Sequence, residues 1–210
     1  MSKVIGIAAQ KGGVGKSTTC RNLAAELAMN GYKVLAVDCD NQASMTDCFG
    51  IYEPENLEYT LYHLMMDVML ERDIPSKEAY IVQKEGIDII PSSIELSAIE
   101  INLVSTISRE YVLKTVIDEI KGEYDYVLLD CMPSLGLMTL NVLAACDSVL
   151  IPALCVAFCY AHLYSRMSYF IATFLIKMRI TITSNRRALP VHPHHLAKVV
   201  PLIFQGYLIP

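Results

Sequence analysis

The stretch from Val4 to Thr19, reading VIGIAAQKGGVGKSTT, constrains the fold more than any other part of the 210-residue chain. A short apolar run is followed by a loop with three glycines, by Lys-Ser-Thr, and by an alanine- and leucine-rich segment typical of a helix. Strand, glycine loop and helix in that order provide the context of a phosphate-binding loop. The general pattern G-x-x-x-x-G-K-[ST] would have its first glycine where this chain has Gln10.

The residues of this loop nevertheless supply the required chemistry. Glycines allow successive backbone N–H groups to turn inward on a phosphate, because no Cβ blocks the approach. The following helix adds the partial positive charge of its N-terminus. We expect Lys16 to reach the β- and γ-phosphates and the Ser17 hydroxyl to bind Mg²⁺. The loop therefore predicts a nucleotide site.

The octapeptide KGGVGKST, residues 11–18, resembles the deviant Walker A motif of the ParA/MinD class of P-loop ATPases. The resemblance implies that Lys11 reaches across a dimer interface to the partner's nucleotide, since it has no evident role within one protomer. ATP would then lie between two subunits, with Lys11 and Lys16 as catalytic residues. The predicted nucleotide-binding residues are Lys11, Gly12, Gly13, Val14, Gly15, Lys16, Ser17 and Thr18.

Two aspartates lie at and just after the end of the next predicted strand, residues 33–38. Asp38 and Asp40 come at its carboxyl end, where open α/β sheets bind ligands. Two carboxylates beside a phosphate loop can hold the water shell of Mg²⁺ and orient an attacking water. The segment also resembles the family's second motif, DxDPQ followed by a small residue and a threonine. That resemblance implies that Asp40 is catalytic and Asp38 belongs to the Mg²⁺ shell, although Asn41 replaces the usual proline.

A third motif is the apolar strand predicted at residues 124–130, YDYVLLD, which ends in Asp130. A carboxylate in this position next to a P-loop has the Walker B role near Mg²⁺. The metal residues that we predict are thus Ser17, Asp38 and Asp130. The continuation DCMPSLGLMTLNVL resembles the ParA-type segment that leads into a helix at the dimer interface.

The periodicity of the remaining chain predicts an α/β fold of P-loop NTPase type. One mostly parallel, twisted sheet would be flanked by helices on both faces. Further strands are expected at residues 3–9, 87–90 and 148–151, and helices at residues 16–30, 94–107 and 109–121. We expect residues 51–84 to be largely helical.

The resemblance ends at Pro152, where the composition also changes. Residues 1–151 hold 22 acidic and 11 basic residues, whereas residues 152–210 hold six basic and no acidic ones. We therefore divide the chain into an ATPase core, 1–152, and an atypical segment, 153–210. Three explanations stay open: an out-of-frame or truncated gene, a divergent part that completes the sheet with a strand at Arg179–Thr183, or membrane association by Leu154–Met178.

The cysteines and the N-terminus favour a cytoplasmic protein. Seven cysteines are an odd number without C-x-x-C spacing, and we interpret them as reduced. The first residues lack the pattern of a signal peptide.

The resemblance implies a slow, Mg²⁺-dependent ATPase that forms a homodimer on ATP and acts in plasmid or chromosome partition. Its expected partners are non-specific DNA and a ParB-type protein, and no membrane. One alternative is a MinD-like membrane-associated ATPase, which would require an amphipathic C-terminal helix that residues 201–210 do not supply. Another is a nucleotide-binding regulator with defective hydrolysis or output.

Overall fold

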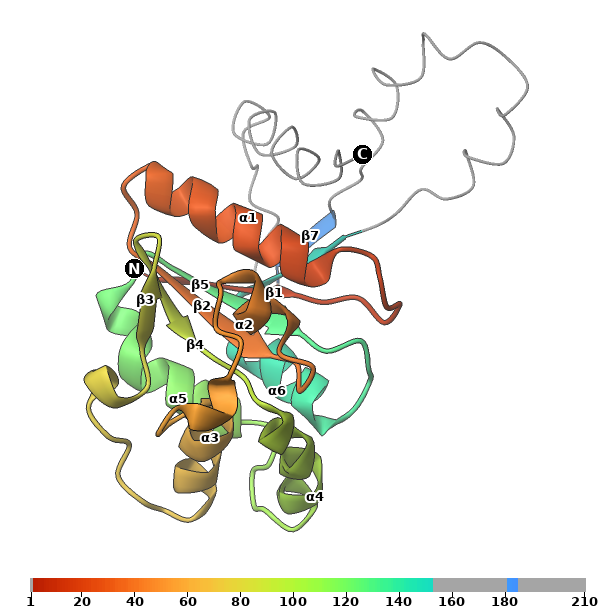
Figure 1. The fold of residues 1–210 in the computed structure, drawn as a ribbon. Coiled ribbons are helices and arrows are strands. Elements are labelled where there is room, and N and C mark those ends of the chain that lie inside the picture. The colour runs from red at the N-terminus through yellow and green to blue at the C-terminus, as the bar shows by residue number, and fades with distance from the viewer. Residues whose placement is uncertain (1, 153–180, 185–210) are drawn as a thin grey trace, which may run out of the picture.

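A twisted sheet runs through the centre of the computed structural model, which describes residues 2–152 and 181–184 (Figure 1). Within these residues the sheet has seven strands in the order β3-β4-β2-β5-β1-β6-β7. The strands are β1 (Lys3–Ile7), β2 (Val34–Cys39), β3 (Val82–Lys84), β4 (Ile87–Ile90), β5 (Tyr126–Cys131), β6 (Ser148–Ile151) and β7 (Thr181–Ser184). The five inner strands are parallel, and the edge strands β3 and β7 are antiparallel to their neighbours. The predicted mostly parallel α/β sheet is confirmed.

Helices cover both faces of this sheet, as predicted. They are α1 (Lys16–Met29), α2 (Ser44–Cys48), α3 (Leu61–Met69), α4 (Ile99–Val104), α5 (Val112–Ile120) and α6 (Leu137–Ala145). Alternate residues of β2 belong to two separate apolar clusters, with Val34 and Ala36 packed with α1 and Leu35 and Val37 packed with α3, α5 and α6. Burial on both faces explains why the inner strands are nearly continuous apolar runs.

A buried amide joins α5 to α6. Asn141 is fully buried in α6, and its Oδ1 accepts a hydrogen bond from the Leu113 N–H at 3.0 Å. Its Nδ2 donates to the Arg109 carbonyl oxygen at 2.8 Å. The side chain therefore caps the start of α5 from a different helix and satisfies backbone groups that a helix leaves unpaired.

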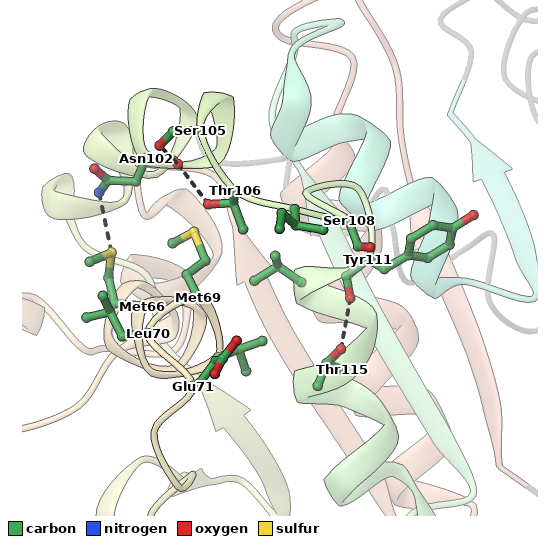
Figure 2. Close-up of a pocket in the computed structure, with 13 residues that line it drawn as sticks. Met66, Met69, Leu70, Glu71, Asn102, Ser105, Thr106, Ser108, Tyr111 and Thr115 are labelled. Carbon is green, nitrogen blue, oxygen red and sulfur yellow. Dashed lines mark hydrogen bonds between the residues drawn. The ribbon is translucent and has the colours of Figure 1, made fainter.

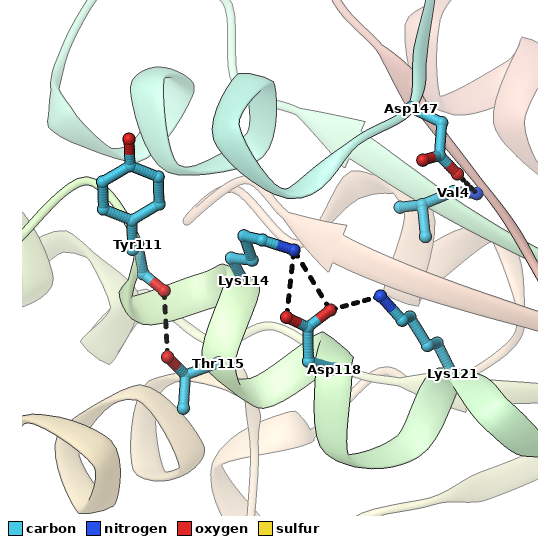
Figure 3. Close-up of polar contacts among 7 residues, drawn as sticks. All are labelled: Val4, Tyr111, Lys114, Thr115, Asp118, Lys121 and Asp147. Carbon is cyan, nitrogen blue, oxygen red and sulfur yellow. Dashed lines mark hydrogen bonds and ion pairs between the residues drawn. The ribbon is translucent and has the colours of Figure 1, made fainter.

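Exposed ion pairs and one β1 contact are visible in Figure 3. Asp118 on α5 pairs with Lys114 at 2.9 Å and with Lys121 one turn further on. Such exposed pairs contribute little to stability. At the start of β1, the Val4 N–H donates to Asp147 Oδ2 at 2.9 Å, which fixes the loop before β6 against this strand.

The region between residues 51 and 84 differs from the predicted helix. It contains α3, short 3-10 turns and the edge strand β3, which forms a hairpin with β4. Glu85 and Gly86 make the turn, with φ angles of 53° and 76°. Positive φ at both central residues is the geometry of a two-residue type I′ hairpin, which favours glycine. The Glu-Gly pair, directly after the segment interpreted as helical, is thus a hairpin signal that places β3 before the turn.

The predicted strand at Arg179–Thr183 has a counterpart in β7, whose residues 181–184 pair with β6. Among the described residues, no helix is long and apolar enough to cross a membrane. The predicted membrane segment, Leu154–Met178, lies outside those residues.

Candidate phosphate and metal site

The phosphate loop leaves β1 at Ile7 and enters α1 at Lys16. Gly13 and Gly15 have φ angles of 70° and 84°, which side chains with a Cβ rarely adopt. Gly15 is the N-cap residue of α1, and no side chain caps this helix end. The first turn also has no acidic residue. The N-terminus of a long helix therefore presents uncapped N–H groups and partial positive charge, which is the requirement for binding a phosphate.

The two lysines of the loop lie in different environments. Lys16 is only 7% exposed, whereas Lys11 is exposed, as are its neighbours Gly12 and Gly13. Lys11 forms no ion pair with any residue that the structure describes. Of the other predicted loop residues, Val14 is buried and Gly15, Ser17 and Thr18 are partly buried.

The sheet brings the predicted carboxylates together at the carboxyl ends of its inner strands. Asp38 and Asp130 are register partners on the neighbouring strands β2 and β5, and both are fully buried. Asp130 also pairs with Ile7 in register, directly before the phosphate loop. Asp40 follows two residues after Asp38 and is 7% exposed.

Asp130 is a buried carboxyl group without hydrogen-bond partners. Neither of its oxygens accepts a hydrogen bond from a described residue. Burial raises the pKa of Asp130 to about 8, and the negative charges of Asp38 and Asp40 add to this, while the nearby Ser17 hydroxyl and Lys16 ammonium lower it. Ser17 is thus close enough to affect the carboxylate without a hydrogen bond of standard geometry. Two orphaned buried oxygens are the acceptors that a cation or its water shell would satisfy.

Asp38, by contrast, is held by hydrogen bonds from its own segment. Its Oδ2 accepts from the Thr46 N–H at 2.8 Å and from the Thr46 hydroxyl at 2.7 Å, and its Oδ1 accepts from the Asp40 N–H at 3.1 Å. Burial raises the pKa of Asp38 to about 6, even though these hydrogen bonds lower it. Asp40 in turn accepts from the Gln42 N–H at 3.0 Å, which forms the turn after β2.

Thr46 is a site residue to which the sequence assigned no role. It is fully buried in α2, and its Oγ1 also accepts a hydrogen bond from the Ser92 N–H at 3.0 Å. The only sequence signal was the threonine in the family motif. Just before α2, Ala43 has a φ of 50°, so the turn places a residue with a Cβ in the left-handed region.

The donor set fits Mg²⁺. It offers carboxylate and hydroxyl oxygens, which this hard cation prefers. Among residues 2–152 and 181–184, no group of three or more His, Cys, Asp or Glu side chains could hold a metal by itself. Mg²⁺ generally keeps several waters and takes further ligands from phosphates, with only one or two carboxylates from protein.

A separate pocket of about 500 Å³ lies between α3, the segment after α4, and the start of α5 (Figure 2). Met66, Met69 and Tyr111 contribute to its walls. No lysine or arginine lines it, so it offers nothing that would bind a triphosphate. The phosphate loop and the three aspartates lie outside this pocket.

Comparison with known proteins points to the same chemistry. A family model described as "AAA domain" matches residues 2–182. The sporulation initiation inhibitor protein Soj of Bacillus subtilis (strain 168) is 46% identical over 155 residues, which are 74% of this chain and 59% of Soj. The chain therefore spans less than two thirds of that relative's length.

Several solved structures resemble the fold, and two of them show the range of the relatives. Cobyrinic acid a,c-diamide synthase from Mycobacterium smegmatis, with bound ADP and magnesium, has a TM-score of 0.67 and 36% identity, over 73% of this chain and 60% of that one. A plasmid partition protein from Borrelia burgdorferi has a TM-score of 0.60 and 32% identity, over 71% and 64% of the two chains.

Proposed function

Because the chain belongs to the AAA-domain family of P-loop ATPases, and within it to the ParA/Soj type, we propose that it is a Mg²⁺-dependent ATPase of plasmid or chromosome partition. The observation that carries the proposal is the juxtaposition of an uncapped helix N-terminus with the orphaned carboxylate of Asp130. The first accepts phosphate and the second accepts a cation, and Mg·ATP combines both.

We assign the site residues as follows. The loop N–H groups and Lys16 hold the phosphates, and Ser17, Asp38 and Asp130 hold Mg²⁺ with its water shell. When bound, Mg²⁺ neutralises charge that develops on the phosphoryl oxygens. Asp40 orients the attacking water, since it comes directly after the carboxyl end of β2. No arginine belongs to the motifs, which agrees with slow turnover.

We further propose that ATP joins two copies of the chain. Lys11 supports this, because it is exposed and forms no ion pair with any described residue. The ATP dimer would bind DNA without sequence preference and respond to a ParB-type partner in the cytoplasm. Residues 1–152 would form the ATPase core, and residues 153–210 an atypical segment of unassigned role.

The test is ATP binding and ATP-dependent sedimentation of the wild type, Lys11→Ala and Lys16→Ala. We expect a wild-type dimer with Mg·ATP, a monomer that still binds ATP for Lys11→Ala, and loss of most ATP affinity for Lys16→Ala. Lys84→Ala is the matched control, because this lysine is exposed on the edge strand β3 and does not belong to the loop. A dimer that forms equally well without Lys11 would refute its role across the interface, and absence of Mg·ATP binding would refute the function.

A further inference from the structure

Thr46 occupies a position from which one hydroxyl group controls the orientation of Asp38. The Ser92 N–H donates to Thr46 Oγ1 at 3.0 Å, so this oxygen is already an acceptor. Because a hydroxyl group has a single proton, that proton is left to point at Asp38 Oδ2, 2.7 Å away. The direction of both hydrogen bonds is thereby determined.

The consequence for Asp38 is a fixed carboxylate plane. Oδ2 receives two donors from Thr46, and Oδ1 receives one from the Asp40 N–H. Because a carboxylate oxygen has two lone-pair sites, Oδ2 is fully used and Oδ1 keeps one site as an acceptor. All three donors belong to fully or nearly fully buried residues, so water does not compete for them.

The same hydroxyl also connects two strands. Thr46 follows β2, whereas Ser92 follows β4, the neighbouring strand of the sheet. Ser92 is fully buried, and the adjacent Pro91 carbonyl accepts from the Leu61 N–H at 2.9 Å at the start of α3. The position of Thr46 is therefore set by the ends of two strands and not by its short helix alone.

We propose that Thr46 is a positioning residue, whose hydroxyl holds the Asp38 carboxylate in the orientation that receives the Mg²⁺ water shell. The inference rests on the proposed function, since it concerns the metal of that site. Thr46 acts through Asp38 and touches neither nucleotide nor metal. Residues that orient metal ligands in this way change metal affinity by roughly 10- to 100-fold when they are replaced.

The test compares Thr46→Val, which keeps the shape and removes the hydroxyl, with Thr46→Ser, which keeps the hydroxyl. ATP affinity is measured by calorimetry across a Mg²⁺ titration and again in EDTA. For Thr46→Val we expect the Mg²⁺ concentration for half-maximal binding to rise about tenfold or more. ATP affinity in EDTA should stay within about twofold, because the phosphate loop is unchanged. Thr46→Ser should remain within about twofold of the wild type in both measurements.

A second comparison separates positioning from simple loss of stability. In an Asp38→Asn background, Thr46→Val should produce no further change in Mg²⁺ dependence, since its effect passes through that carboxylate. If Thr46→Val does not fold, Thr46→Cys takes its place, because a thiol is a weaker donor of similar size.

The proposal fails if Thr46→Val keeps the wild-type Mg²⁺ dependence, or if ATP affinity falls equally with Mg²⁺ and with EDTA. Those results leave the proposed ATPase intact. A wild-type protein that binds no Mg·ATP refutes the function itself, and the two failures are therefore distinguishable.

Discussion

Because the carboxyl group of Asp130 is buried without a hydrogen-bond partner, we expect its removal to stabilise the protein in the absence of ligand. Its pKa is raised to about 8, mainly by burial, whereas the unfolded carboxyl group titrates near about 3.9. A group whose pKa is raised on folding binds more protons in the folded state. The free energy of unfolding therefore falls as the pH rises from the unfolded pKa towards the folded pKa.

The size of this destabilisation at pH 7 follows from the difference between pH 7 and the pKa of the unfolded carboxyl group. Each pH unit above the unfolded pKa costs about 1.4 kcal/mol, which gives an upper bound of about 4 kcal/mol at pH 7. Structural relaxation and entry of water reduce such costs. We expect Asp130→Asn to gain about 2 kcal/mol, a rise in Tm of about 4–8 °C for a chain of this length.

The assay is thermal unfolding in EDTA at several values between pH 5 and pH 8. The difference in Tm between Asp130→Asn and the wild type should grow with pH, because the buried carboxyl group destabilises the wild type more as the pH rises. Asp73→Asn is the control, since it makes the same substitution at an exposed position. Stabilisation by Mg·ATP should be smaller in Asp130→Asn than in the wild type. A variant that is less stable at pH 8, or a difference independent of pH, would refute the reasoning.

Three further substitutions test local features. Ala43→Gly should stabilise the protein by about 1 kcal/mol in urea unfolding, because glycine adopts φ 50° without strain; a less stable variant would contradict the strain. Asn141→Ala should destabilise by about 2 kcal/mol in the same assay, since it leaves the buried Leu113 N–H unpaired; an unchanged midpoint would show that water replaces the cap. Gly15→Ala should weaken ATP binding, measured by calorimetry, at least tenfold because it strains the loop at φ 84°; wild-type affinity would count against the loop geometry.

The sequence predicted the inner sheet and most of the site because local patterns determine them. Strands buried on both faces are apolar runs, and the strands that contain Asp38 and Asp130 were predicted to within one or two residues. The edge strand β3 was missed because an edge strand is short and half exposed, so its composition is that of a surface segment.

Thr46 and Asn141 were missed for another reason. Their roles depend on partners 46 and 28 positions away in the chain, at Ser92 and Leu113. No periodicity within a short window contains that information. Only the packing of β4 beside β2, and of α6 beside α5, makes a threonine a bridge and an asparagine a cap.

The strand order has a consequence for how the candidate site is assembled during folding. β5 lies between β1, which leads into the phosphate loop, and β2, which carries Asp38. The two parts of the candidate site therefore come together only when β5 is inserted between these strands, which are synthesised much earlier. Such non-local pairing is slow, because the entropy of closing a long loop precedes the contacts. Nucleotide cannot bind fully to a nascent chain that lacks β5. Under the proposed function, ATP binding would therefore report on completed folding, and it would selectively stabilise the finished sheet over partly assembled forms.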